Sequence, residues 1–225
     1  MTTKKIYDLN QPIYHNCPCW PTLDPPTVER LYYIPREGAN VEMLKFNTHT
    51  GTHVDVPYHK LEDGKTLEQI PIEAWIGEGV VIDVSFVGER NLVTEEMLRE
   101  AAPPVAPRDI AMLYFGWSKQ RAFTQKYLMD FPALDETGAR WLVDNKVKAV
   151  GTDALSVDLF DKYMDPEKGP IAHKVLLGAG VLLVEEVYLE EIAQLGPKRW
   201  MFFCLPMAIQ GAGGAPARVI AVDQS

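Results

Sequence analysis

The eleven residues His49-Thr-Gly-Thr-His53-Val-Asp55-Val-Pro-Tyr-His59 carry the strongest pattern in the chain, with the spacing H-x3-H-x-D-x3-H. They include three of the five histidines of the protein. Imidazole and carboxylate groups are the usual ligands of a divalent cation such as zinc or manganese. The density of these groups in one short segment therefore predicts a metal site.

The same segment restricts its own backbone. In a straight strand His49 and His53 would lie roughly 13 Å apart, too far to share an ion, so the chain must bend at Gly51. Asp55 follows His53 by two residues, and in an extended stretch both side chains point to the same side. Both can then reach one ion. Two roles remain open for His59, as a further ligand or as a group that works beside the metal.

A second pair of candidate ligands, His173 and Glu185, lies downstream. A short helix from about His173, ending near Gly178 or Gly180 and followed by a strand, would bring the two side chains together. A carboxylate at the end of an apolar strand needs a partner or a metal. Glu186 is the alternative if the register of that strand is shifted by one residue.

Short β-branched and apolar runs alternate with a few short helical patterns, which predicts a mixed α/β fold. A chain of this length can fold around one core, so residues 1–225 are expected to form a single domain. The expected strands are 80–84, 110–115, 147–150, 181–184, 200–205 and 218–222, the expected helices are 94–102 and 135–145, and a loop is expected from Cys17 to Arg36.

The composition excludes several classes of function. The chain has 225 residues, a formal charge of −9 and a pI of about 5.1, which argues against binding to a nucleic-acid backbone. Three cysteines cannot form a disulfide scaffold. No apolar run reaches the roughly 20 residues of a membrane span, and no signal peptide is visible. We therefore expect a cytoplasmic protein that does not bind membranes.

Two weaker patterns have ordinary explanations. His15-x-Cys17-x-Cys19 could bind a soft metal, but buried or free thiols are the more common outcome. The stretch Gly211-Ala-Gly-Gly-Ala-Pro216 is not followed by a helical pattern, so it predicts a loop before the last strand rather than a phosphate loop.

The eleven-residue segment resembles the H-x-G-T-H-x-D-x-P-x-H signature of the cyclase-like metal-dependent hydrolases, which include bacterial kynurenine formamidase and isatin hydrolase. The resemblance covers most of the chain. It extends to Asp8-Leu-Asn-Gln-Pro-Ile13, Cys19-Trp20-Pro21, Gly151-Thr-Asp153-Ala-Leu-Ser156-Val-Asp158, Leu205-Pro206 and Gly213-Gly-Ala-Pro216-Ala-Arg218.

This resemblance implies a swivelling β/β/α domain with a mixed sheet and few short helices. It implies a homodimer or homotetramer, with the active site near subunit contacts. The ligand sets that it implies are His49, His53 and Asp55 on one ion and Asp55, His173 and Glu185 on a second, with Asp55 shared and His59 as the acid/base residue. The isatin hydrolases of this family bind one manganese and lack the glutamate. Glu185 therefore favours two ions per subunit, zinc before manganese.

The expected activity is hydrolysis of a C–N bond in an aryl formamide or cyclic amide by metal-activated water, with His59 giving a proton to the leaving nitrogen. Candidate walls of the substrate pocket are Tyr14, Trp20 and Phe46. Isatin-like ring opening of a cyclic amide, imide or lactone is the alternative among enzymes. A non-catalytic metal-binding protein is the alternative outside them, although structural zinc sites are usually closed and rich in cysteine.

Overall fold

The computed structural model describes residues 4–224, and its central feature is an eight-stranded sheet. The strands lie in the order β1 (Ile6–Asp8), β12 (Gly214–Asp223), β11 (Trp200–Pro206), β5 (Ile76–Asp83), β7 (Ile110–Tyr114), β9 (Ala149–Thr152), β10 (Leu182–Glu185) and β4 (His53–Asp55). β4 also pairs with β12, so the strands of this sheet other than β1 close into a barrel. β5, β7, β9 and β10 run parallel, and the other pairings of this sheet are antiparallel. Outside it, β6 (Leu92–Val93) and β8 (Ala133–Leu134) form a short parallel pair.

The helices are few and short, as expected. They are α1 (Ile34–Glu37), α2 (Glu95–Ala101), α3 (Gln125–Met129), α4 (Glu136–Asp144), α5 (Phe160–Tyr163), α6 (Ile171–Gly178) and α7 (Glu190–Ala193). Two of the predicted helices, α2 and α4, begin at residues whose side chains accept a backbone N–H, Thr94 from Met97 and Asp135 from Gly138. The short helix expected from about His173 is α6. No helix within residues 4–224 is long and apolar enough to cross a membrane.

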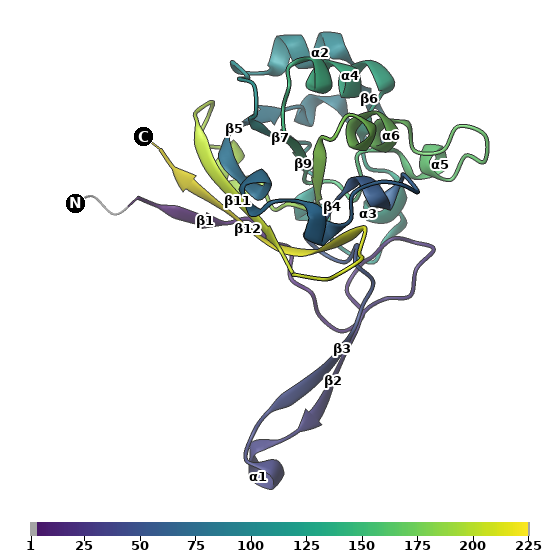
Figure 1. Ribbon diagram of the computed structural model, residues 1–225, viewed down its shortest axis with the longest axis vertical. Coiled ribbons are helices and arrows are strands. Elements are labelled where there is room, and N and C mark those ends of the chain that lie inside the picture. Colours follow the sequence, from purple (N-terminus) through teal and green to yellow (C-terminus); the bar gives the residue numbers. More distant parts are fainter. Residues whose placement is uncertain (1–3, 225) are drawn as a thin grey trace.

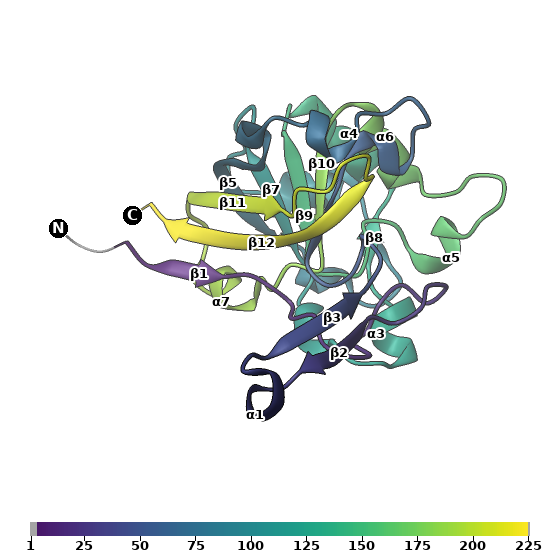
Figure 2. The same cartoon turned by 60° about the horizontal axis from the view of Figure 1, so that its bottom comes forward.

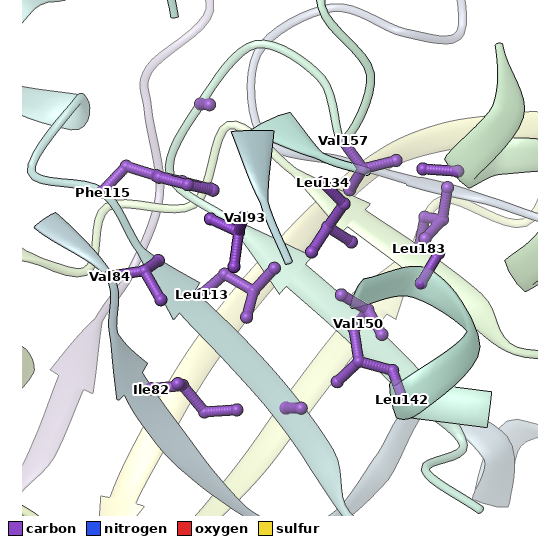
Figure 3. Close-up of a cluster of buried hydrophobic side chains, with 14 of the residues drawn as sticks. Ile82, Val84, Val93, Leu113, Phe115, Leu134, Leu142, Val150, Val157 and Leu183 are labelled. Carbon is purple, nitrogen blue, oxygen red and sulfur yellow. The ribbon is translucent and has the colours of Figure 1, made fainter. Parts of the chain in front are cut away.

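The strand β7 is buried on both faces, because two apolar clusters lie on opposite sides of the sheet. Leu113 packs with the side chains of α2, α4 and α6, which cover the parallel strands (Figures 1 and 3). Met112, the next residue back, belongs to the other cluster together with Val54, Val184 and Phe202. Burial on both faces explains why the parallel strands appear in the sequence as continuous apolar runs.

A hairpin of β2 (Thr27–Tyr32) and β3 (Val41–Lys45), with α1 at its tip, projects away from the sheet (Figures 1 and 2). We call residues 27–45 the arm. The prediction of a loop from Cys17 to Arg36 was wrong at this point. Every residue of β3 is exposed and no residue of β2 is buried, so the arm lacks the alternation of buried and exposed residues by which a strand is found in sequence.

The last strand is longer than predicted, because it begins at Gly214 and not near Arg218. The expected loop is therefore confined to the residues just before it. A Cβ atom at Gly214 would lie 2.5 Å from the carbonyl oxygen of Val54 and 2.8 Å from Cε1 of His49. Only glycine allows β12 to approach β4 this closely, and β4 carries two of the candidate ligands.

Gly79→Ala is expected to lower the free energy of unfolding by about 1–3 kcal/mol or more. A Cβ atom at Gly79 would lie 1.9 Å from the carbonyl oxygen of Ile110 on the paired strand β7, so the two backbones would have to separate. Gly178→Ala is the matched control, since a Cβ atom there meets nothing within 4 Å. Chemical denaturation of both variants measures the difference, and equal midpoints would contradict the prediction.

Candidate metal centre

Two neighbouring strands bring three candidate ligands together. His53 and Asp55 lie on β4, two residues apart and therefore on one side of the strand, as the sequence predicted. Antiparallel pairing places Glu185, the last residue of β10, directly opposite His53. Oε2 of Glu185 lies 3.5 Å from Nε2 of His53, so Glu185 and not Glu186 faces the histidines.

The predicted bend at Gly51 is present, with a φ of 62° that favours glycine. The carbonyl oxygen of Gly51 accepts a hydrogen bond from Nδ1 of His53 at 2.8 Å. The bend returns His49 to the cluster, where its Nδ1 lies 2.7 Å from Oδ1 of Asp55. The side chains of His49, His53 and Asp55 therefore converge, although the turn at Gly51 separates His49 from the other two.

His173 reaches the same place from α6, and a buried carboxylate holds it there. Nδ1 of His173 lies 2.7 Å from Oδ2 of Asp158, which also accepts the backbone N–H of His173. Nε2 of His173 lies 3.5 Å from Oδ2 of Asp55 and 3.6 Å from Oε1 of Glu185. Since Nδ1 is the donor in both His53 and His173, each ring keeps the lone pair of Nε2 for another partner.

The spacing of these atoms fits a divalent cation better than it fits hydrogen bonds. Separations of 3.5–3.6 Å between Nε2 atoms and carboxylate oxygens are too long for good hydrogen bonds. Two ligands of one tetrahedral ion, each about 2.1 Å from it, would lie about 3.4 Å apart. Nε2 of His53 and Oδ2 of Asp55 are also buried without a hydrogen-bond partner, which is costly unless a cation satisfies them.

The ligand atoms form two groups that share Asp55. One group holds His49, Asp55 and His59, and the other holds His53, Asp55 and Glu185, with all ligand atoms of a group within 4.8 Å of one another. The shared carboxylate agrees with the predicted arrangement, but the division of the histidines differs from it. His59 lies with His49, its Nε2 4.0 Å from Oδ2 of Asp55, so its role as ligand or proton carrier stays open.

The electrostatics of the cluster favour positive charge. Burial lowers the pKa of His53, but Glu185 and Asp55 outweigh it and raise the pKa to about 9. Burial likewise opposes protonation of His173, and Glu185, Asp158 and Asp55 raise its pKa to about 10. Burial lowers the pKa of His59 to about 2. The carboxylates therefore attract a cation at His53 and His173, whereas the ring of His59 stays neutral.

A pocket of about 420 Å³, its open mouth included, lies over these groups. Trp20 lines it with Leu23, Leu155 and Tyr163, so one of the three predicted wall residues is in place. The structure does not bring the other two there. Tyr14 is 47% exposed and lies beside the guanidinium of Arg121, and Phe46 lines a separate hollow.

Several residues near the site were missed by the sequence reasoning. Asp158 lies in a quoted motif, but nothing in the sequence pairs it with His173. Tyr163 and Lys60 contact each other beside His59, from distant parts of the chain. Glu186, the alternative ligand considered from the sequence, also lines the pocket, but its carboxylate accepts hydrogen bonds from Tyr127 and Arg121.

The sequence His15-x-Cys17-x-Cys19 does not form a ligand cluster. Cys17, Cys19 and Cys204 are buried and unpaired, and Nδ1 of His15 accepts the backbone N–H of Val28. Within residues 4–224 the potential metal-binding groups are the two that share Asp55.

The fold is that of a mixed α/β protein with a closed sheet. The histidines and carboxylates gathered at β4 and β10 form a candidate metal-binding site on it. The sequence profile of the "Putative cyclase" family matches residues 7–159, and the chain belongs to this family.

Curated relatives match most of the chain. Kynurenine formamidase from Bacillus cereus is 27% identical over 224 residues, which cover 98% of each chain. Cyclase-like protein 3 from Oryza sativa subsp. japonica is 30% identical over 190 residues, 82% of this chain and 66% of that protein.

Solved structures share the fold. One described as a potential metal-dependent hydrolase with cyclase activity has a TM-score of 0.80 and 27% identity, and the match covers 99% of this chain and 100% of that one. Isatin hydrolase A from Ralstonia solanacearum has a TM-score of 0.85 at 22% identity, over 98% of this chain and 92% of that one. The predicted family and the mixed α/β fold with few short helices are thus confirmed.

Proposed function

We propose that the protein is a metal-dependent hydrolase that cleaves the C–N bond of an aryl formamide or a related amide. The convergence of His49, His53, Asp55, His173 and Glu185 below an open pocket carries this proposal. The similarity to kynurenine formamidase over the full length supports the choice of substrate.

The chain offers ligands for two divalent ions that share Asp55. Ligands drawn only from histidine and carboxylate suit Zn²⁺ first and Mn²⁺ second. Such ions, when bound, supply a hydroxide nucleophile near neutral pH and polarise the substrate carbonyl.

The residues of the chain complete the reaction. Asp158 holds the ring of His173, and Gly51 holds that of His53, so that both Nε2 atoms face the cluster. His59 lies at the pocket wall, and burial keeps its ring unprotonated before the reaction. Its role as general acid and base requires that the charge developing on the bound substrate raises its pKa toward neutrality, so that it takes up a proton during attack and gives one to the leaving nitrogen. Trp20 and Tyr163, whose rings lie 4.5 Å apart, offer aromatic surface to a substrate ring.

Ring opening of a cyclic amide is the second candidate, and the shared fold with isatin hydrolase A supports it. The non-catalytic alternative fits less well, because a purely structural ion would not need an open pocket beside it. These alternative functions are tested by assaying the protein against N-formylkynurenine, isatin and simple imides, with metal analysis of the same sample. Turnover of none of them by the metal-loaded protein would contradict the proposed function.

We also propose a homodimer or homotetramer, because the arm exposes a set of large apolar side chains. They are Leu31, Tyr32, Tyr33, Ile34, Val41, Met43 and Leu44, each at least 38% exposed. Apolar surface of this kind on a projecting hairpin is typical of an interface.

Leu44→Lys is expected to shift the protein to lower mass in light scattering, because a charge buried in an apolar interface without a partner is costly. Leu44 is 53% exposed in the single chain. Phe86→Lys is the matched control, since Phe86 is a comparably exposed apolar residue outside the arm. A wild-type protein that is already monomeric, or an equal effect of both variants, would exclude the arm as the interface.

A cytoplasmic location and a single domain over residues 1–225 complete the proposal. Three unpaired cysteines are consistent with a reducing compartment. The sheet takes strands from both ends of the chain, as one continuous domain requires.

A further inference from the structure

A cation without an anionic partner lies beside the pocket. Nζ of Lys60 donates a hydrogen bond to the hydroxyl of Tyr163 and lies 4.1 Å from the centre of its ring. Among residues 4–224, no carboxylate forms an ion pair with this ammonium group, and Asp55, Glu185 and Asp158 attract it only from farther away. Lys60 is half-buried, so its ammonium group has lost part of its hydration without gaining an ion-pair partner.

The contact with Lys60 leaves the hydroxyl proton of Tyr163 available as a second hydrogen-bond donor. A lysine ammonium group can only donate, so the oxygen of Tyr163 is the acceptor. The proton of the Tyr163 hydroxyl can then be donated to a second group, either the ring of His59 or a substrate atom that displaces it. Tyr163 lines the pocket, and its oxygen lies 3.4 Å from Nε2 of His59. The pair thus presents a positively polarised O–H donor next to the proposed acid/base residue.

We propose that Lys60 and Tyr163 form an anion-recognition subsite, and that the preferred substrates are aryl amides with a carboxylate next to the reacting nitrogen. This inference rests on the proposed function. His59 and Tyr163 lie side by side, so the two substrate groups that they meet must be neighbours, as in an ortho-substituted ring. The carboxylate would accept the hydrogen bond of Tyr163 and lie close to the charge of Lys60, which then gains the anion that it lacks.

The test compares two fluorescent ligands of equal size, 2-aminobenzoate and its neutral isostere 2-aminobenzamide, bound to the full chain saturated with Zn²⁺. We expect the wild type to bind the anion about 10-fold more tightly or better, since hydrogen bonds to charged groups are the stronger ones. Lys60→Met and Tyr163→Phe should each reduce this preference to about 2-fold or less. Both variants keep the apolar bulk of the side chain, and unchanged zinc content shows that the metal centre is intact.

The controls are Lys65→Met and Tyr58→Phe, which remove the same groups from exposed positions outside the pocket. They should leave the preference unchanged. If Lys60 acts together with Tyr163, the double variant should lose no more than either single variant. A preference that survives in Lys60→Met would place the carboxylate on the metal and overturn the proposal, as would a wild type that binds both ligands equally.

Turnover measurements distinguish a failure of this inference from a failure of the proposed function. With 2-formamidobenzoate and neutral formanilide as substrates, Lys60→Met should raise KM for the first at least several-fold and leave the second nearly unchanged. If neither amide is cleaved, the proposed function fails, and the binding comparison still decides the inference. If both are cleaved and Lys60→Met changes them equally, the inference alone fails.

Discussion

His59→Ala is expected to lower kcat by about 10²–10⁴-fold while the protein keeps nearly its full metal content. The loss should appear mainly in kcat, because the proton moves in the transition state and not on binding. The neutral ring of His59 lines the pocket, and its Nε2 is 4.0 Å from the nearest oxygen of Asp55. Steady-state kinetics and elemental analysis of the same preparation measure both quantities.

His53→Ala is the control for this prediction and should lose metal and activity together. Its Nε2 is fully buried between two carboxylates and has no other partner. The geometry also allows the opposite result, because His59 shares a potential ligand group with His49 and Asp55. Loss of metal from His59→Ala would make His59 a ligand, and the proton would then have to come from another group.

Asp55→Asn is expected to abolish metal binding and reduce activity to the detection limit, which is the largest effect predicted for one substitution. Asp55 is completely buried and belongs to both potential ligand groups. Its two oxygens lie within 3.6 Å of the ring nitrogens of His49, His53 and His173. An amide carries no negative charge and offers one oxygen instead of two, so it cannot hold two cations.

The thermal stability of the protein provides a second measurement. A ligand at 100 times its Kd stabilises the folded state by about 2.7 kcal/mol, so added metal should raise the Tm of the wild type but not that of Asp55→Asn. Asp153→Asn is the matched control. Asp153 is equally buried but accepts backbone hydrogen bonds from Phe115, Trp117 and Ser118. That variant should be destabilised and still respond to metal.

The parts of the fold that are buried on both faces could be predicted from the sequence. β5, β7 and β10 appear as apolar runs because helices cover one side and the barrel interior the other. The turn at Gly51 could also be predicted, because ligand geometry requires it. The arm could not, since its strands bury no face and therefore leave no periodicity in the sequence.

The surroundings of the site show the same limit. His53 and Asp55 are close in sequence, so their common direction follows from strand geometry alone. Asp158 contacts His173 although the segment that holds α5 lies between them in the chain, and Lys60 contacts Tyr163 beside the pocket although about a hundred residues separate them. Contacts between distant segments depend on the whole fold, and spacing in one sequence does not encode them.

During folding, the site can form only after strand β4 has joined the sheet. It closes the barrel by pairing with β10 on one side and β12 on the other, both far away in the sequence. Such long-range closure forms slowly, and the cluster at β4 cannot assemble before it. An ion bound by residues of β4, β10 and α6 would therefore stabilise strand pairings that form late in folding. Such an ion should lower the unfolding rate much more than it raises the folding rate, and so increase the kinetic stability of the native state.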